Sequence, residues 1–327
     1  MPEPRERPVV AVLCERSTDR PPGLDGLDVE FRYCDATGLA DAVDGARALL
    51  LWDFFSTAVR DVWSRAGSLE WIHVTAAGVD TLLFDELRDS DVVVTNARGV
   101  FDRPIAEYVL GAVLAHAKDS QVSFDLQRQH EWRHRETRSI LGATALVVGT
   151  GGIGREIARL LRAAGLEVRG IGRVASEDDP DFGAVAASKD LASEVGWADH
   201  LVLAAPLTEA TRGLVDERVL SAMKSDAHLV NVARGPIVDE PALLDALLHR
   251  RIGAATLDVF ATEPLPTDHP LWTAPGVTVT AHMSGDVVGW RDTLARQFAT
   301  NVQLWLTGEP LLNVVDKKLG YVPRGDA

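Results

Sequence analysis

The sequence predicts an α/β protein of two domains, one of them built on a doubly wound parallel sheet. Its 327 residues exceed what one ordinary hydrophobic core accommodates. Short apolar runs rich in Val, Ile and Leu alternate with segments of helical length, a rhythm that implies parallel strands joined by crossover helices. A glycine-rich turn near the middle of the chain joins one such run to a helix-like segment.

The first hundred residues predict a small α/β domain. Four apolar runs suit buried parallel strands, and Asp- and Glu-bearing stretches of helical length separate them. The runs cover residues 8–14, 48–52, 71–76 and 92–96.

A long helix is predicted over residues 104–126. Pro104 suits its first turn, and Ile105, Val109 and Val113 recur at helical spacing. A polar connector over 127–139 follows. The strand pattern then returns at 143–148, 167–171, 200–205, 228–232, 255–259 and 277–280, and an amphipathic helix is predicted over 290–306.

Composition and charge argue against some classes of binding partner and indicate where in the cell the protein is expected. The net charge of −15 and the isoelectric point near 5.0 argue against nucleic acid or anionic membranes. Two cysteines are too few for a disulfide framework. The start, Pro2 to Pro8, has no apolar signal core, and no apolar stretch is long enough to span a bilayer. We therefore expect a cytoplasmic enzyme, in which an anionic substrate must be attracted locally.

The glycine-rich turn predicts a Rossmann-type dinucleotide site. Gly149, Gly151 and Gly154 form a G-x-G-x-x-G between an apolar strand and a helix. The first glycine permits the tight turn, the second lets the backbone approach a pyrophosphate, and the third lets helix and strand pack closely. The pyrophosphate would lie at the helix N-terminus, where N–H groups and the dipole favour an anion.

The end of the next strand favours the phosphorylated cofactor. A carboxylate that accepts from ribose hydroxyls is common there, but Gly172 and Arg173 occupy the position. Arg173 could bind a 2′-phosphate, which predicts NADP in preference to NAD. Val174 supplies no hydroxyl beside it, and the acidic residues 177–179 would repel a phosphate. The alternative is a solvated loop cation.

Three residues at successive strand ends predict a catalytic group. Arg234 suits a carboxylate or carbonyl because its guanidinium is a rigid fork of donors. His282 can exchange a proton near neutral pH. Glu263 could orient that imidazole and favour its charged form. Each alone is more often structural, but together at one sheet edge they indicate chemistry.

The segment from His130 to His134 matches the H-E-x-x-H zinc signature. Arg133 lies inside it and no third ligand is indicated, so we predict no metal site. We interpret the segment as an exposed connector with Trp132 packed near the domain junction.

Several segments also carry a resemblance to a known family. They are residues 71–80, 149–154, 206–208 with 211, 231–235, 257–260 with 263–266, and 281–285. In this order they resemble the D-isomer-specific 2-hydroxyacid dehydrogenases over nearly the whole chain. The pair Gly172 and Arg173 resembles the glyoxylate and hydroxypyruvate reductase branch.

The resemblance implies catalytic and substrate-binding roles. Arg234 would bind the carboxylate of a 2-oxo acid and polarise its carbonyl. His282 would be the general acid in reduction, oriented by Glu263. The backbone N–H groups of Ala77 and Gly78 would hold the carboxylate from the other domain.

Cofactor contacts are implied in the same way. Gly152 and Ile153 would offer N–H groups to the phosphates, and Asp258 would bind the nicotinamide carboxamide. The remaining contacts would come from Pro206, Thr211 and Ala233.

The family's architecture is implied as well. A discontinuous, flavodoxin-like substrate domain would cover residues 1–101 and 286–327, and the Rossmann domain residues 102–285. The long helix would lie at a homodimer interface. Ala281 departs from the family pattern, which has proline before the histidine. Two alternatives stay open: a cofactor-sensing co-regulator on the same scaffold, and a relative that acts on another small anion.

Overall fold

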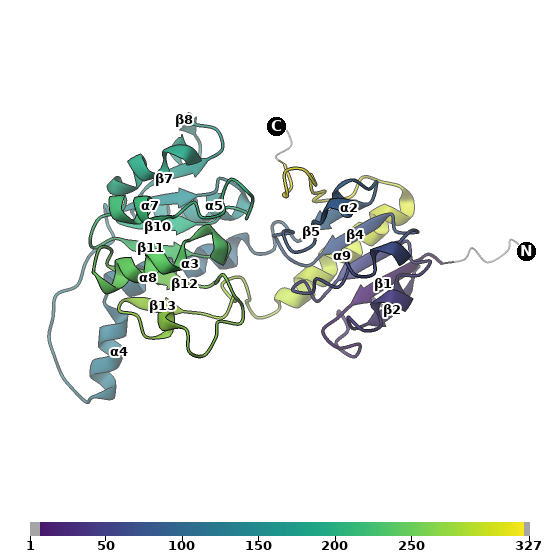
Figure 1. Ribbon diagram of the computed structural model, residues 1–327, viewed down its shortest axis with the longest axis horizontal. Coiled ribbons are helices and arrows are strands. Elements are labelled where there is room, and N and C mark those ends of the chain that lie inside the picture. Colours follow the sequence, from purple (N-terminus) through teal and green to yellow (C-terminus); the bar gives the residue numbers. More distant parts are fainter. Residues whose placement is uncertain (1–6, 324–327) are drawn as a thin grey trace, which may run out of the picture. The chain divides into compact units, whose positions relative to one another are not determined.

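The computed structural model describes residues 7–323, so most of the proline-rich start lies outside the described residues. The chain forms two compact units. One takes in the chain up to Val100 and again from Val287, and the other is Phe101–Asp286. Each unit has its own sheet (Figure 1).

The first unit is built on a five-stranded sheet with the order β2-β1-β3-β4-β5, in which every pair is parallel. This is the strand order of flavodoxin-like folds. The strands are β1 (Val9–Leu13), β2 (Glu30–Cys34), β3 (Ala48–Leu51), β4 (Trp71–Val74) and β5 (Val93–Asn96). The helices are α1 (Leu39–Ala42), α2 (Asp85–Arg88) and α9 (Trp290–Thr307).

The second unit carries an eight-stranded sheet with the order β13-β12-β11-β10-β6-β7-β9-β8. All pairs are parallel except β8 with β9. The order reverses at β6, as in the doubly wound Rossmann fold, so the predicted fold class is confirmed. The strands are β6 (Thr144–Val148), β7 (Glu167–Gly172), β8 (Ser176–Asp179), β9 (Gly183–Ala187), β10 (His200–Leu203), β11 (His228–Asn231), β12 (Ala254–Leu257) and β13 (Val277–Val279).

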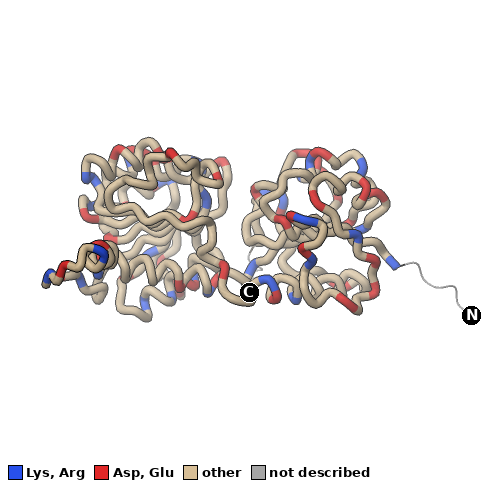
Figure 2. The backbone as a smooth tube through the Cα atoms, turned by 90° about the horizontal axis from the view of Figure 1, so that it is seen from below, with Lys and Arg blue, Asp and Glu red and all other residues tan. Residues whose placement is uncertain are grey.

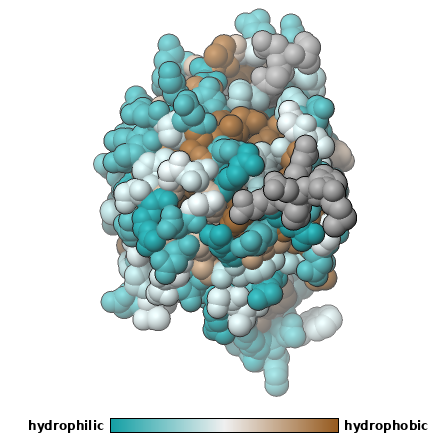
Figure 3. All heavy atoms as spheres, turned by 90° about the vertical axis from the view of Figure 1, so that its right-hand side faces the viewer, coloured by the Kyte–Doolittle hydropathy of each residue, from teal (hydrophilic) through white to brown (hydrophobic). Residues whose placement is uncertain are grey.

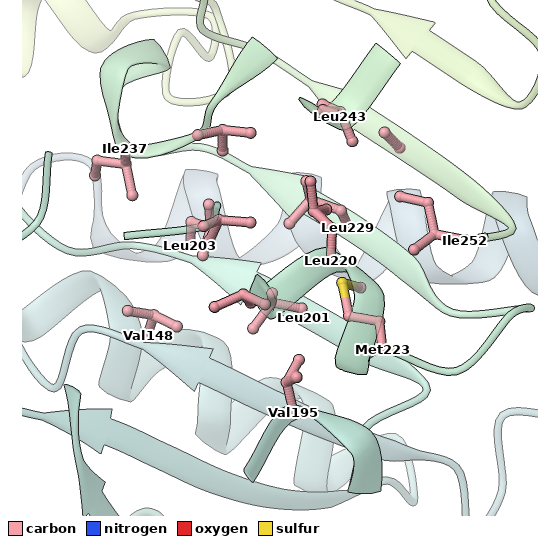
Figure 4. Close-up of a cluster of buried hydrophobic side chains, with 14 of the residues drawn as sticks. Val148, Val195, Leu201, Leu203, Leu220, Met223, Leu229, Ile237, Leu243 and Ile252 are labelled. Atoms are coloured by element: carbon pink, nitrogen blue, oxygen red, sulfur yellow. The ribbon is translucent and has the colours of Figure 1, made fainter. Parts of the chain in front are cut away.

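The helices of this unit are α3 (Asp102–Ala117), α4 (Ser120–Arg128), α5 (Gly152–Ala163), α6 (Leu191–Glu194), α7 (Glu217–Ala222) and α8 (Glu240–Leu248). Every residue of β10, β11 and β12 is buried, because helices cover both faces of a parallel sheet. On one face Leu201 and Leu203 meet Leu220 of α7 and Leu243 of α8 (Figure 4). This core holds the strand ends in place.

The single long helix predicted over 104–126 is wrong. The structure has two helices, α3 and α4, that meet at Lys118 and Asp119. Asp119 adopts a left-handed conformation with φ 46°, which interrupts the helical hydrogen-bond pattern. As a result α4 projects from the sheet, followed by a long connector (Figure 1).

The strands β2, β8 and β9 were not predicted. The sequence of β8, Ser-Glu-Asp-Asp, lacks the apolar residues of a buried strand, and β2 is exposed or half-buried except at Cys34. Both are edge strands, where only one side of the strand needs a partner.

Charged residues of both signs are intermixed along the chain (Figure 2). On the face shown in Figure 3, hydrophilic residues predominate and hydrophobic ones gather in a limited area. Among the described residues, no helix combines the length and apolar character that crossing a membrane requires.

Candidate active site

The three predicted catalytic residues follow three neighbouring strands of the second sheet. Arg234 follows β11, Glu263 follows β12 and His282 follows β13. These strands are parallel neighbours, so their carboxyl ends share one edge of the sheet, where open α/β folds bind ligands.

The structure brings Glu263 and His282 together. Nδ1 of the imidazole lies 2.7 Å from Oε2 of the carboxylate, and each side chain is 28% exposed. Oε1 of Glu263 accepts the Phe260 N–H at 2.8 Å. Burial alone would raise the pKa of Glu263, but the bonds from His282 and Phe260 and the charge of Arg234 lower it. The carboxylate is therefore ionised at neutral pH and presents a negative charge to the imidazole of His282.

The backbone around Arg234 is fixed against the loop that carries Glu263. The Asn231 amide accepts the Ala233 N–H at 3.0 Å and donates to the Arg234 carbonyl at 3.1 Å. A Cβ on Gly235 would lie 1.8 Å from the carbonyl carbon of Phe260, so only glycine allows this approach. Nη1 of Arg234 donates to the Ala233 carbonyl at 2.7 Å.

Asp258 holds the turn on which His282 lies. Its side chain is fully buried and accepts from the Thr280 hydroxyl at 2.5 Å and from the N–H groups of Met283 and Ser284, both at 2.9 Å. The Asp258 carbonyl accepts the His282 N–H at 2.8 Å. His282 has φ 50°, a conformation that costs energy outside glycine and persists only where neighbours enforce it.

Both oxygens of the Asp258 carboxylate thus accept hydrogen bonds from groups of the protein itself. The predicted bond to a nicotinamide carboxamide stays a prediction, and the geometry shows a different use of both oxygens. Tyr108 of α3 extends this network, because its hydroxyl lies 2.6 Å from that of Thr280. Sequence reasoning missed Tyr108 and Thr280, since neither stands in a recognisable motif.

The glycine turn has the geometry that a dinucleotide requires. Gly149 has φ 108°, and a Cβ there would lie 2.6 Å from the Ala204 backbone. A Cβ on Gly154 would lie 1.8 Å from the Gly149 carbonyl oxygen. A Cβ on Gly151, by contrast, would have no such neighbour within 4 Å, which leaves room for a ligand beside the backbone. The amino end of α5 begins at Gly152 and Ile153, so the residues present fit a diphosphate.

The loop after β10 is stabilised by its own side chains. The Thr211 hydroxyl donates to the Pro206 carbonyl at 2.7 Å and accepts the Thr208 N–H at 2.8 Å. This loop lies at the same sheet edge as the glycine turn, because β10 and β6 are parallel neighbours. Its predicted contact with the cofactor stays a prediction, as does that of Ala233.

Arg173 is exposed directly after β7. Of the three acidic residues expected to weaken phosphate binding there, Asp179 is paired elsewhere: Arg155 of α5 binds its two oxygens at 2.8 and 2.5 Å. Arg155 thereby lowers the pKa of Asp179. Glu177 and Asp178 are exposed, so two acidic side chains stay near Arg173 in sequence.

The predicted carboxylate-binding residues of the first unit follow β4. Ala77 ends a bend over residues 75–77 directly after the strand, and Gly78 follows it. Within residues 7–323, neither N–H group donates to a protein acceptor. Trp52, Asp53 and Phe54 follow β3, the parallel neighbour of β4, so they lie at the same edge of that sheet.

The H-E-x-x-H segment is not helical. His130 has φ 57°, and residues 131–140 form no regular element. Glu131 pairs with Arg133 at 2.6 Å. Trp132 is 99% exposed, so its predicted packing near the domain junction is wrong. The helical spacing that gives zinc proteases their paired imidazoles is absent from this segment.

Comparison with known proteins decides the family. The family model described as D-isomer specific 2-hydroxyacid dehydrogenase, NAD binding domain, matches residues 110–284. The chain belongs to the D-isomer specific 2-hydroxyacid dehydrogenase family. It is therefore an NAD(P)-dependent oxidoreductase, as the resemblance implied.

Individual members of the 2-hydroxyacid dehydrogenase family resemble this one over most of their length. The (S)-sulfolactate dehydrogenase of Chromohalobacter salexigens is 34% identical over 254 residues, 77% of this chain and 82% of the relative. Glyoxylate/hydroxypyruvate reductase A of Serratia proteamaculans is 30% identical over 274 residues, 80% of this chain and 84% of the relative.

Among solved structures, a D-isomer specific 2-hydroxyacid dehydrogenase from Xanthobacter autotrophicus Py2 in complex with NADPH and MES is similar. It has a TM-score of 0.80 and 30% identity, and the match covers 95% of this dehydrogenase and 99% of that chain. The similarity supports the use of a nicotinamide dinucleotide, and the Serratia reductase supports the predicted branch of the family.

Proposed function

We propose that this dehydrogenase reduces a small 2-oxo acid to the D-2-hydroxy acid, with His282 as the proton donor. The observation that carries the proposal is the 2.7 Å contact between His282 and Glu263 on the sheet edge that also carries Arg234. In this role the unit with the glycine turn binds the dinucleotide and the first unit binds substrate.

Each residue of the proposed site has its own role in carbonyl reduction. A bound nicotinamide cofactor supplies hydride to the carbonyl carbon. The π electron pair moves to the oxygen, which takes a proton from Nε2 of His282, because Nδ1 is engaged by Glu263. The ionised Glu263 stabilises the charged imidazole before that transfer.

Arg234 binds the substrate carboxylate and draws electron density toward the carbonyl oxygen. The N–H groups of Ala77 and Gly78 hold the same carboxylate. Because the chain carries a net charge of −15, these local donors must overcome repulsion of an anionic substrate.

The substrate's side chain is proposed to face aromatic residues of the first unit. Phe54 packs on Phe55 with ring centroids 4.5 Å apart, and on Trp290 at 6.2 Å. Phe55 is 56% exposed, which leaves apolar surface for a small substituent.

NADPH is the proposed cofactor, with Arg173 at its 2′-phosphate. Pairing of Asp179 with Arg155 supports this, since the guanidinium compensates the negative charge of one of the three acidic side chains. Values of kcat/KM measured with NADPH and NADH test it, and a clear preference for NADH would refute it. Arg173→Ser should lower kcat/KM with NADPH by about tenfold or more and leave that with NADH nearly unchanged.

We also propose a homodimer whose interface includes α3 and the arm formed by residues 118–142. Apolar side chains on this arm are exposed in the single chain: Val122 42%, Phe124 53%, Trp132 99% and Leu141 78%. Burial of these side chains against a second copy would remove their apolar surface from water. The molar mass in solution tests this, and Trp132→Ser should shift it toward the monomer.

The two free buried thiols, Cys14 and Cys34, suit the cytoplasm proposed from the sequence.

The decisive experiment is a panel of 2-oxo acids, including glyoxylate and hydroxypyruvate, assayed for NADPH oxidation. His282→Asn should lower kcat/KM by about a hundredfold or more. The matched control is His249→Asn, since His249 also pairs with a carboxylate, Asp245, at 2.9 Å but lies outside the site. Wild-type turnover in the His282 variant would refute the mechanism, and no sustained turnover of any panel member would favour a co-regulator.

A further inference from the structure

The bend after β4 presents two adjacent backbone N–H groups in one direction. In an extended strand, successive peptide groups point to opposite sides. Here the carbonyls of Ala76 and Ala77 both accept from the end of β5: the Ala97 N–H bonds the first at 3.0 Å, and Nδ2 of Asn96 bonds the second at 2.6 Å.

These two hydrogen bonds also fix the direction of the N–H groups, because each carbonyl lies in one rigid peptide plane with the N–H of the next residue. In a trans peptide, the N–H points opposite to the carbonyl of the same plane. The N–H groups of Ala77 and Gly78 belong to the planes of the Ala76 and Ala77 carbonyls, so both point away from β5. Two consecutive N–H groups on one side form a concave site for an anion.

Asn96 is itself fixed, so it can impose this direction. The residue is 2% exposed. Its Oδ1 accepts the Arg98 N–H at 3.2 Å, which leaves Nδ2 for the Ala77 carbonyl, and its backbone N–H donates to the Asn313 carbonyl at 3.3 Å. An amide held at both ends cannot exchange its oxygen and nitrogen without losing both bonds.

We propose that Asn96 is a positioning residue for the substrate carboxylate. By holding the Ala77 carbonyl, it turns the Gly78 N–H toward the anion without touching the anion itself. The Ala97 N–H does the same for the Ala77 N–H through the Ala76 carbonyl. This inference rests on the proposed function, in which these two N–H groups bind the 2-oxo acid.

Asn96→Leu tests the role, because leucine is similar in size, uncharged and unable to donate. The matched control is Asn301→Leu in the same unit. Asn301 is also fully buried, and its amide likewise donates to one main-chain carbonyl and accepts one N–H, both of Leu312, at 3.1 and 2.8 Å. Asn96→Ala replaces the leucine variant if leucine prevents folding.

Steady-state kinetics with glyoxylate or hydroxypyruvate, and a thermal melt of each variant, give the readout. We expect Asn96→Leu to raise KM for the 2-oxo acid by about tenfold or more, with KM for NADPH unchanged and kcat altered far less. Asn301→Leu should lower the melting temperature to a similar extent but leave both KM values unchanged.

The outcomes separate this inference from the proposed function. Equal KM values for the 2-oxo acid in wild type and Asn96→Leu would overturn the role of Asn96 alone. A similar rise in KM in Asn301→Leu would also overturn it, since the effect would then follow from loss of stability. A wild-type enzyme that reduces no 2-oxo acid would overturn both.

Discussion

Acid should destabilise the first unit through His73, and the size of the effect follows from its surroundings. The imidazole is fully buried on β4. Nδ1 lies 2.8 Å from the Thr95 hydroxyl, and Nε2 is buried with no hydrogen-bond partner in the described chain. Burial lowers the pKa of His73 from 6.5 to about 3.

Proton linkage gives the direction in which pH changes the stability of the first unit. Because the pKa is lower in the folded state, the unfolded chain binds the proton first, and stability is lost as pH falls below the unfolded value of 6.5. At about pH 5 the unfolded imidazole is ~97% protonated and the folded one ~1%, which favours unfolding by ~2 kcal/mol. At about pH 7.5 the same difference is under ~0.1 kcal/mol.

His73→Phe isolates this effect. Phenylalanine keeps a ring against Trp71 and Phe298, whose centroids lie 6.1 and 5.5 Å from that of His73, and it cannot titrate. Between about pH 7.5 and 5, the wild type should lose ~2 kcal/mol more unfolding free energy than the variant. His134→Asn, an exposed histidine of the arm, controls for loss of an imidazole.

Hydrogen exchange measured on peptides of β3, β4 and β5 reports on this unit by itself, since its core strands open only with the unit as a whole. The free energy of exchange at both pH values gives the comparison directly. Parallel losses in wild type and His73→Phe would refute the reasoning.

Three further predictions follow from other contacts. Glu263→Gln keeps the acceptor for the Phe260 N–H but removes the charge beside His282. The value of kcat/KM should therefore fall about tenfold or more, and an unchanged kcat/KM would contradict this. Gly154→Ala would force a Cβ to within 1.8 Å of the Gly149 oxygen, so the melting temperature should fall and the dissociation constant for NADPH rise; wild-type binding by calorimetry would contradict it. Lys317→Met removes three bonds from Nζ to the carbonyls of Leu87, Ser90 and Val92, at 3.0, 2.5 and 3.0 Å. The loss should lower the unfolding free energy by about 1–3 kcal/mol. An unchanged urea midpoint would count against this prediction.

Much of the site could be predicted because its residues follow strands that the sequence marks clearly. The strands before Arg234 and Glu263 are buried at every position, so their apolar runs stand out, and the strand before His282 still carries two valines although it is half-buried or exposed. In a parallel sheet, successive strands end at one edge, so order along the chain predicts neighbourhood in space.

The parts that depend on distant partners could not be predicted. The break at Asp119 depends on one backbone conformation within a helical pattern. The hairpin of β8 and β9 depends on Arg155, which pairs with Asp179 and Asp181 from another element. No periodic pattern in the sequence indicates such ion pairs, because each partner alone is an ordinary polar residue.

The sequence by itself determined most of the buried strands, the glycine turn and the positions of the three proposed catalytic side chains at strand ends. Local apolar periodicity records which face of each element is buried, and glycine records where the backbone must turn. Only the tertiary structure decided which side chains of separate elements bond to one another. Asp258 accepts N–H groups of the turn that carries His282, and the Tyr108 hydroxyl bonds that of Thr280 in the same network. The Asn96 amide bonds the Ala77 carbonyl in the bend after β4. Those uses depend on hydrogen-bond directions between residues far apart in the chain, which exist only once the chain has folded.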